Sequence, residues 1–229
     1  RTDASLIHRE QSVLQKLIAI GGVAEQESFE VQVKARLASA DTVMRALESD
    51  EITVIRAAHY HHYDTYFFFD DPAQGRLRYR EDEFLDDKNS VTTARARLTL
   101  TGPSREASFG SVLLFRSRFF APATHSPRFY REYFKPAREP EVEKERRRWL
   151  VAYRGVQFYV HRDRLLNARD GEFLEVKSRT WSRRDAQDKA AIIMELLVHL
   201  GARPEDAIEA DYVGLELPRA TAARRHRDH

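Results

Sequence analysis

The chain has 229 residues, of which 42% are hydrophobic and 32% charged, a composition typical of a folded globular protein rather than a disordered one. The formal net charge is only +2, yet all but seven of the 38 basic residues are arginine, whose planar charged group suits phosphate and carboxylate partners. The absence of cysteine excludes disulfides and thiolate chemistry and favours a cytoplasmic location, and without an apolar run of about 18 residues no membrane span is expected.

The first half of the chain predicts short helices and long strands. Residues 5–20 place apolar side chains at helical spacing and end at two glycines, which predicts an N-terminal helix. The stretch FEVQVKARL (29–37) alternates apolar and polar residues and predicts a strand, and residues 39–49 predict a helix capped by Ser39. Strands are then expected over 52–70, 76–80, 94–103 and 111–120, with a turn at 71–75 and an acidic loop over 81–90.

The second half begins with a charged, proline-containing segment, residues 125–148, which we expect to be partly helical. Strands over 147–154 and 156–165 should meet in a hairpin at Arg154-Gly155. A strand over 171–181, a helix over 182–201 capped by Ser182 and a short strand over 210–217 complete the series. About eight strands, joined mostly by short turns, predict an α+β fold with a closed or nearly closed antiparallel sheet and flanking helices.

The polar faces of most predicted strands are basic. Residues i and i+2 of a strand share a face, and this groups Arg76, Arg78 and Arg80; Arg95 and Arg97; Arg116 and Arg118; Arg146 and Arg148; and Glu175 with Lys177. GC-rich coding sequence would also raise the arginine content, and ordinary solvent faces also alternate. However, such faces mix signs, because like charges across strands destabilise by roughly 0.2–1 kcal/mol per pair. The repeated basic face therefore indicates a surface or cavity that binds a polyanion.

Two carboxylates share these basic faces and narrow the choice of polyanion. Glu30 lies on the face of Lys34, and Glu175 on the face of Lys177. A carboxylate repels phosphate unless a hard cation such as Mg²⁺ lies between them, so this pairing indicates phosphoryl chemistry. Nucleic acid is a less favoured partner, because the aromatic residues lie in apolar runs and do not form exposed stacking platforms.

Several segments, taken in order, resemble the CYTH proteins, the triphosphate tunnel metalloenzymes. Glu30-Val-Gln-Val-Lys34 resembles the E-x-E-x-K opening strand of that family, and the similarity continues through YDTYFFFDDPAQGRLRYRED, RLTLTGP, YVHRDRL with DGEFLEVKS, and LGARPEDAIEADYVGL. The resemblance implies a tunnel domain over 28–217 that is built on an eight-stranded antiparallel β-barrel. Residues 1–27 would form an N-terminal helical segment or linker, and residues 218–229 a disordered basic tail.

The resemblance also implies a site and an activity. Glu30, Asp163 and Glu175 would hold Mg²⁺ or Mn²⁺, with Glu30 and Lys34 as catalytic residues. The implied phosphate-binding residues are Lys34, Arg78, Arg80, Arg97, Arg116, Arg118 and Lys177. The implied activity is metal-dependent hydrolysis of inorganic triphosphate or of a nucleoside or thiamine triphosphate, with a class IV adenylyl cyclase that converts ATP to cyclic AMP as the alternative. The implied partners are a triphosphate-containing small molecule and either an upstream kinase-like domain or a second copy of the chain.

Three positions depart from the family pattern and keep a further alternative open. Gln32 replaces the second glutamate of the opening motif, Lys177 replaces an acid, and Thr101 replaces a lysine. Fewer carboxylates predict weaker metal binding, which favours a non-catalytic module that binds nucleotide or polyphosphate. A second metal hypothesis, based on His59 and His61 of HYHHYD, lacks an evident third ligand, so we expect these to be ordinary sheet histidines.

Overall fold

A computed structural model of the chain describes residues 11–21, 24–26, 29–102, 105–115, 118–167, 171–209 and 211–215. Within these ranges, only the backbone is described for residues 24–26, 105–107, 115 and 118. The predicted tail, residues 218–229, and about half of the predicted N-terminal segment, residues 1–27, lie outside them, so the predicted division of the chain stays a prediction.

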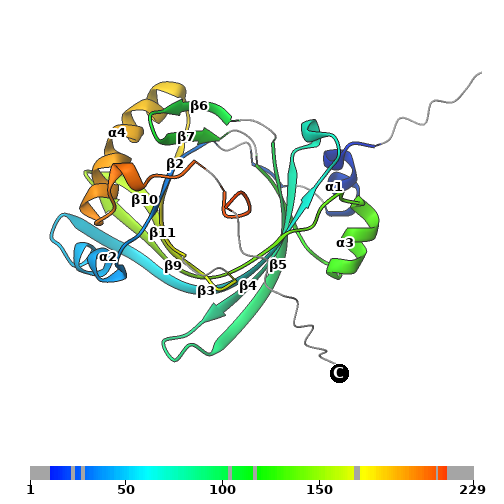
Figure 1. The fold of residues 1–229 in the computed structure, drawn as a ribbon, viewed down its shortest axis with the longest axis horizontal. Helices are drawn as coiled ribbons and strands as arrows, with labels where there is room; N and C mark the ends of the chain where they lie inside the picture. Colours follow the sequence, from blue (N-terminus) through cyan, green and yellow to red (C-terminus); the bar gives the residue numbers. More distant parts are fainter. Residues whose placement is uncertain are drawn as a thin grey trace, which may run out of the picture.

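One antiparallel sheet dominates the described part of the chain. Its eleven strands follow the order β1-β8-β5-β4-β3-β9-β10-β11-β2-β7-β6. Their bounds are Ala24–Gln26 (β1), Phe29–Arg36 (β2), Ile52–Phe68 (β3), Arg76–Leu85 (β4), Val91–Thr101 (β5), Arg105–Phe109 (β6), Val112–Phe115 (β7), Arg118–Pro122 (β8), Glu141–Tyr153 (β9), Val156–Leu165 (β10) and Glu172–Thr180 (β11). The sheet curls around a central space (Figure 1), but no described pairing joins its outer strands, β1 and β6. The predicted antiparallel α+β fold is confirmed, whereas the count of eight strands and the closure of the sheet are not.

The helices flank the outside of this sheet (Figure 1). They are α1 (Val13–Gly21), α2 (Ala40–Leu47), α3 (Pro127–Phe134) and α4 (Arg183–His199), with short 3₁₀ turns at Pro72–Gln74 (η1) and Pro204–Asp206 (η2). The predicted caps are confirmed, because the Ser39 side chain accepts from the backbone N–H of Asp41, and that of Ser182 from the backbone N–H of Asp185. Among the described residues, no helix combines the length and the apolar character that a membrane crossing requires.

The hydrophobic core lies between the convex face of the sheet and the helices. Val31 and Val33 of β2 and Val176 of β11 pack with Ile193 and Leu197 of α4. A second cluster joins the outward residues of β4 and β5 to α1 and α3, through Leu17, Leu77, Leu98, Tyr130 and Phe134. Because side chains alternate along each strand, the polar residues of the same strands point to the concave side.

The strand register brings charged residues of neighbouring strands side by side on this concave face. Between β2 and β11, Lys34 pairs with Glu175, Gln32 with Lys177, and Glu30 with Arg179. Between β4 and β5, Arg80 pairs with Arg97 in the same way. The predicted β9–β10 hairpin is confirmed, with both Arg154 and Gly155 at positive φ.

Two predicted strand boundaries are wrong because the strands run further than expected. The predicted acidic loop over 81–90 is strand as far as Leu85, since Asp82 and Phe84 continue the pairing of β4 with β5. The strand predicted over 147–154 begins at Glu141, where it pairs with β3. In both segments a run of charged residues continues the alternation of inward and outward side chains.

Two other predicted strands differ in kind. Residues 111–120 contribute to two strands with different partners: β7 pairs with β2 and β6, whereas β8 pairs with β5 and β1. The strand predicted over 210–217 is wrong for residues 211–215, which form turns instead of a strand. Figure 1 shows this segment, coloured orange-red, within the space that the sheet encloses.

Candidate functional site

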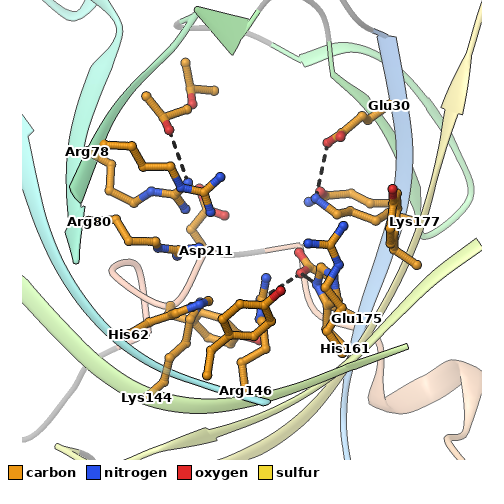
Figure 2. Close-up of a pocket in the computed structure, with 18 of the residues that line it drawn as sticks. Glu30, His62, Arg78, Arg80, Lys144, Arg146, His161, Glu175, Lys177 and Asp211 are labelled. Atoms are coloured by element: carbon orange, nitrogen blue, oxygen red, sulfur yellow. Dashed lines mark hydrogen bonds and ion pairs between the residues drawn. The ribbon is translucent and has the colours of Figure 1, made fainter. Parts of the chain in front are cut away.

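The concave face of the sheet encloses a strongly basic cavity of about 200 Å³. Figure 2 shows Arg78 and Arg80 facing Glu30 and Lys177 across this cavity. Among the described residues, its lining holds eleven basic side chains and three carboxylates, namely Lys34, Arg76, Arg78, Arg80, Arg95, Arg97, Lys144, Arg146, Arg148, Lys177 and Arg179, and Glu30, Glu175 and Asp211. Such an excess of one sign in an enclosed space attracts a compact polyanion.

The predicted site residues divide into three groups. Those that line the cavity are Glu30, Lys34, Arg78, Arg80, Arg97, Glu175 and Lys177. Asp163 does not line it, because its side chain is fully buried behind the wall. Arg116 lies outside the described residues, and for Arg118 only the position in β8 is described. The structure thus brings most of the predicted phosphate-binding residues together, while their roles stay predictions.

Asp64 of β3 anchors the arginines on one side of the cavity. Its carboxylate accepts hydrogen bonds from Nε and Nη2 of Arg80, both at 2.5 Å. The Lys144 Nζ lies 3.8 Å from the same carboxylate. Burial alone would raise the pKa of Asp64, but the guanidinium groups of Arg80 and Arg78 outweigh burial and hold the pKa below its ordinary value. Asp64 is therefore an ionised group that fixes the position of Arg80.

Asp82 of β4 anchors the neighbouring arginines of β5. The carboxylate is fully buried, accepts a hydrogen bond of 3.0 Å from Nε of Arg95, and lies 3.2 Å from Nε of Arg97. His62 Nε2 lies 3.1 Å from the carboxylate on its other side. Burial, with the positive charge of Arg80, lowers the pKa of His62 well below its ordinary value, so this ring is neutral at pH 7.

Asp163 of β10 anchors the floor of the cavity. It accepts hydrogen bonds from Nε and Nη2 of Arg146, at 2.6 and 2.5 Å, and from the hydroxyl of Tyr212 at 2.6 Å. Lys144 Nζ lies 3.6 Å from Asp163 and 4.6 Å from the centre of the Tyr212 ring. Burial, together with the charge of Arg146, lowers the pKa of Lys144 to about 7. An anion in the cavity would favour the protonated form of this lysine.

Each carboxylate in the lining has a basic partner of its own. Glu30 Oε2 lies 3.6 Å from Nζ of Lys177. Glu175 accepts hydrogen bonds from Nη2 of Arg146 at 3.0 Å and from Nδ1 of His161 at 2.8 Å. The third carboxylate, Asp211, is bound by Arg76 and lies 3.8 Å from Nζ of Lys34. Burial, with the charge of Arg146, lowers the pKa of His161 to about 3, so this histidine is neutral and donates from Nδ1 to Glu175.

The Mg²⁺ or Mn²⁺ that the family resemblance implies does not fit this arrangement. A divalent hard cation needs several oxygen ligands that converge on one point. Among the described residues, no group of three or more histidines, aspartates and glutamates is placed to hold a metal ion. The three predicted ligands, Glu30, Asp163 and Glu175, face lysine and arginine instead of one another. Gln32 and Lys177 stand at two positions where the family pattern that the sequence resembles has acids.

The histidines of HYHHYD are split between the two faces of β3. His59 and His61 point to the convex face, where each forms a 2.8 Å contact with a glutamate of β9, Glu145 and Glu143. His62 points to the cavity. The expectation of ordinary sheet histidines therefore fits His59 and His61.

Of the three buried acids behind the cavity wall, the sequence pointed to Asp163 but not to Asp64 or Asp82. The alternation of β3 could have placed His62 and Asp64 on one face, since that face begins with the inward Tyr60. Asp82 was missed because it was assigned to a loop. Asp211 reaches the cavity because the chain returns to the sheet after α4, in turns instead of the strand predicted over 210–217.

Solved structures of other proteins share this fold, among them three from Pyrococcus horikoshii, Vibrio parahaemolyticus and Schizosaccharomyces pombe. The PH1819 protein of Pyrococcus horikoshii is 17% identical, with a TM-score of 0.58, over 80% of this chain and 96% of its own. A candidate adenylate cyclase from Vibrio parahaemolyticus is 13% identical, with a TM-score of 0.51, over 82% of this chain and 97% of its own. A chain of the Schizosaccharomyces pombe Mediator head module is 11% identical, with a TM-score of 0.52, over 74% of this chain and 94% of its own.

The curled antiparallel sheet, its inward basic residues and the similarity to the candidate adenylate cyclase define a CYTH-like tunnel fold. No protein-family profile and no curated protein matches the chain in sequence. At these identities the similarity establishes the fold alone, because one fold hosts many functions. The chemistry of the cavity has to carry any functional conclusion.

Proposed function

We propose that the cavity binds the phosphate chain of a triphosphate-containing small molecule or of inorganic triphosphate. The observation that carries this proposal is the set of basic side chains that project from β2, β4, β5, β9 and β11 into one enclosed space. Arginine and lysine bind phosphate oxygens through charge-assisted hydrogen bonds, and guanidinium groups can do so in bidentate fashion.

The charge balance supports an anionic ligand. Eleven basic residues of the described lining share the site with three lining carboxylates and with Asp64, Asp82 and Asp163 behind the wall. The cations of the described lining outnumber these acids and repel one another, so a ligand with several negative charges would stabilise the site. The buried acids also hold the guanidinium groups in place before the ligand arrives, which lowers the entropic cost of binding.

The size of the cavity supports a small anion. Its 200 Å³ fall below the roughly 300–1,000 Å³ that is usual for pockets that enclose a drug-sized ligand. The space therefore suits a phosphate chain better than a complete nucleotide. If the ligand is a nucleotide, its base and sugar would lie at the mouth of the cavity.

Turnover of the bound triphosphate is the second candidate, and the presence of Glu30 and Lys34 in the lining favours it. These are the two residues that the family resemblance assigns to catalysis. Because no acids among the described residues converge on a metal position, this candidate has no metal-dependent step that the geometry supports.

The experiment is a calorimetric titration of the protein with phosphate, diphosphate, tripolyphosphate and ATP at constant ionic strength. We expect affinity to rise with the number of phosphates, and Arg78→Ala to weaken tripolyphosphate binding about tenfold or more, the usual effect of losing a hydrogen bond to a charged group. The matched control is Arg128→Ala, because the Arg128 side chain is 83% exposed on α3, outside the cavity.

The outcomes separate the candidate functions. Equal affinity for phosphate and tripolyphosphate, or no saturable binding, would contradict the proposal. Phosphate release, or cyclic AMP from ATP, that is lost in Glu30→Ala would add turnover to binding. Binding of an oligonucleotide that weakens steeply with salt, without preference for triphosphate, would instead indicate a nucleic-acid partner.

A further inference from the structure

Lys177 occupies an unusual position in the cavity wall. It belongs to β11, and its backbone pairs with that of Gln32 in β2, so its side chain lies among the residues of the E-x-Q-x-K strand. Its Nζ is 3.6 Å from Oε2 of Glu30, and the two side chains are only 16% and 13% exposed. Figure 2 shows Glu30 and Lys177 together on one side of the cavity.

The position of Lys177 would reduce the repulsion between Glu30 and a bound phosphate. A glutamate in a phosphate-binding cavity repels the ligand unless positive charge lies between them. An ammonium group has three N–H donors, so Lys177 can contact Glu30 and a phosphate oxygen at the same time. Glu175 and Asp211 have equivalent partners in Arg146 and Arg76.

We infer that the cavity takes its oligophosphate as the metal-free anion, with Lys177 supplying the positive charge between Glu30 and the bound phosphate. This inference rests on the proposed function and specifies the form of its ligand. Its basis is the geometry of the Glu30–Lys177 pair together with the absence, among the described residues, of any convergent group of metal ligands.

A consequence is that Mg²⁺ should compete with the protein for the oligophosphate. Mg²⁺ binds phosphate oxygens in solution, and a metal-bound triphosphate carries less negative charge and an ion for which the cavity offers no ligand set. A metal-dependent site would show the opposite response, since the ion would then bridge Glu30 and the ligand.

The test compares tripolyphosphate titrations of the intact protein in EDTA and in excess Mg²⁺, with ionic strength matched by NaCl. We expect the apparent affinity to fall about tenfold or more in Mg²⁺, and Mn²⁺ alone to show no saturable binding by electron paramagnetic resonance. Unchanged or tighter binding in Mg²⁺, or a stoichiometric Mn²⁺ site, would overturn the inference. Absence of tripolyphosphate binding under both conditions would instead overturn the proposed function.

Two substitutions of Lys177 sharpen the test. We expect Lys177→Ala to weaken binding in EDTA about tenfold, and Lys177→Glu to weaken it further in EDTA but to respond favourably to Mn²⁺, because it places a second carboxylate beside Glu30. Lys88→Ala, in the exposed turn between β4 and β5, is the matched control and should bind as the wild type does. If Lys177→Ala, folded as judged by circular dichroism, binds as tightly as the wild type, Lys177 does not have this role.

Discussion

At the scale of single residues, the buried acids behind the cavity wall are best understood as anchors for arginine. Asp64, Asp82 and Asp163 belong to three different strands, and each contacts at least one guanidinium group that lines the cavity. An arginine side chain has several rotatable bonds, so a row of arginines without anchors would lose much rotamer freedom on binding a ligand. The anchors make the inner face a rigid array of donors.

This interpretation predicts a large effect of Asp64→Asn on stability. The substitution keeps the shape of the side chain but removes the carboxylate that accepts both hydrogen bonds of the buried Arg80, which keeps only a more distant contact of 3.9 Å with Asp82. The loss should lower the free energy of unfolding by about 3–5 kcal/mol. Urea denaturation would measure the change. The control is Asp206→Asn, which removes one of the carboxylate partners of Arg203. The Arg203 side chain is 67% exposed and screened by solvent, so stability should change little. Similar losses in both variants would contradict the anchoring role.

His62 should make the fold sensitive to acid. Its pKa in the folded protein lies below the ordinary value of 6.5, so below that pH the unfolded chain binds a proton that the folded chain does not. Stability is therefore fully present above pH 6.5 and should fall as the pH drops, by up to about 1.4 kcal/mol per pH unit for each such histidine.

The prediction is that His62→Gln flattens this acid dependence, as measured by urea denaturation from neutral pH down to about pH 5. His125→Gln, on the exposed segment between β8 and α3, is the matched control. An equally steep slope in His62→Gln would show that His62 does not contribute.

At the scale of elements, the strands that the sequence predicts well are those in which alternation and composition agree. β2, β10 and β11 alternate apolar residues with polar ones, and the apolar set is the one that packs under α2 and α4. The predictions failed where the two signals disagree: residues 81–85 and 141–146 are so rich in charge that composition favours a loop. They form strands because their inward charges meet partners on the neighbouring strands, a compensation between segments far apart in sequence that local propensity does not contain.

The candidate site was predictable within each strand but not between strands. Alternation alone places Arg78 and Arg80 on one face of β4, and Glu30 and Lys34 on one face of β2. It cannot show that β4 and β2 face each other across a cavity, because that depends on how the sheet curls. Nor can alternation show that Asp163 accepts hydrogen bonds from Arg146 and therefore does not line the cavity.

The turn before β4 offers a prediction at this scale. Gly75 has a φ of +77°, and a Cβ atom there would clash with the carbonyl oxygen of Thr101 in the neighbouring strand. Gly75→Ala should therefore displace the start of β4, which carries Arg76 and Arg78, and lower the free energy of unfolding by about 2–4 kcal/mol. Gly102→Ala, where no described heavy atom lies within 4 Å of an added Cβ, is the control. Urea denaturation would compare them, and equal stabilities would contradict the prediction.

At the scale of the whole molecule, the net positive charge is small, but basic side chains are concentrated in the cavity. The chain carries a net charge of only +2, yet its cavity is lined, among the described residues, by eleven basic side chains and three acids. The acidic residues that balance the total must therefore lie mostly elsewhere. A charge distribution of this kind focuses the electrostatic field into the cavity and steers small anions towards it, with less attraction for extended polyanions at the outer surface.

The concentrated charge also predicts that a bound anion will stabilise the entire fold. The strands that supply the cavity wall, from β2 to β11, are the same strands that hold the core, so relief of repulsion among their inward arginines should be felt in global unfolding. At a tripolyphosphate concentration of about 100 times Kd, linkage gives about 2.7 kcal/mol, which for a chain of this size should raise Tm by about 5–10 °C. Scanning calorimetry would measure the shift, with orthophosphate at matched ionic strength as the control. Equal shifts with both anions would mean that the stabilisation is a general salt effect, independent of a site that recognises the phosphate chain.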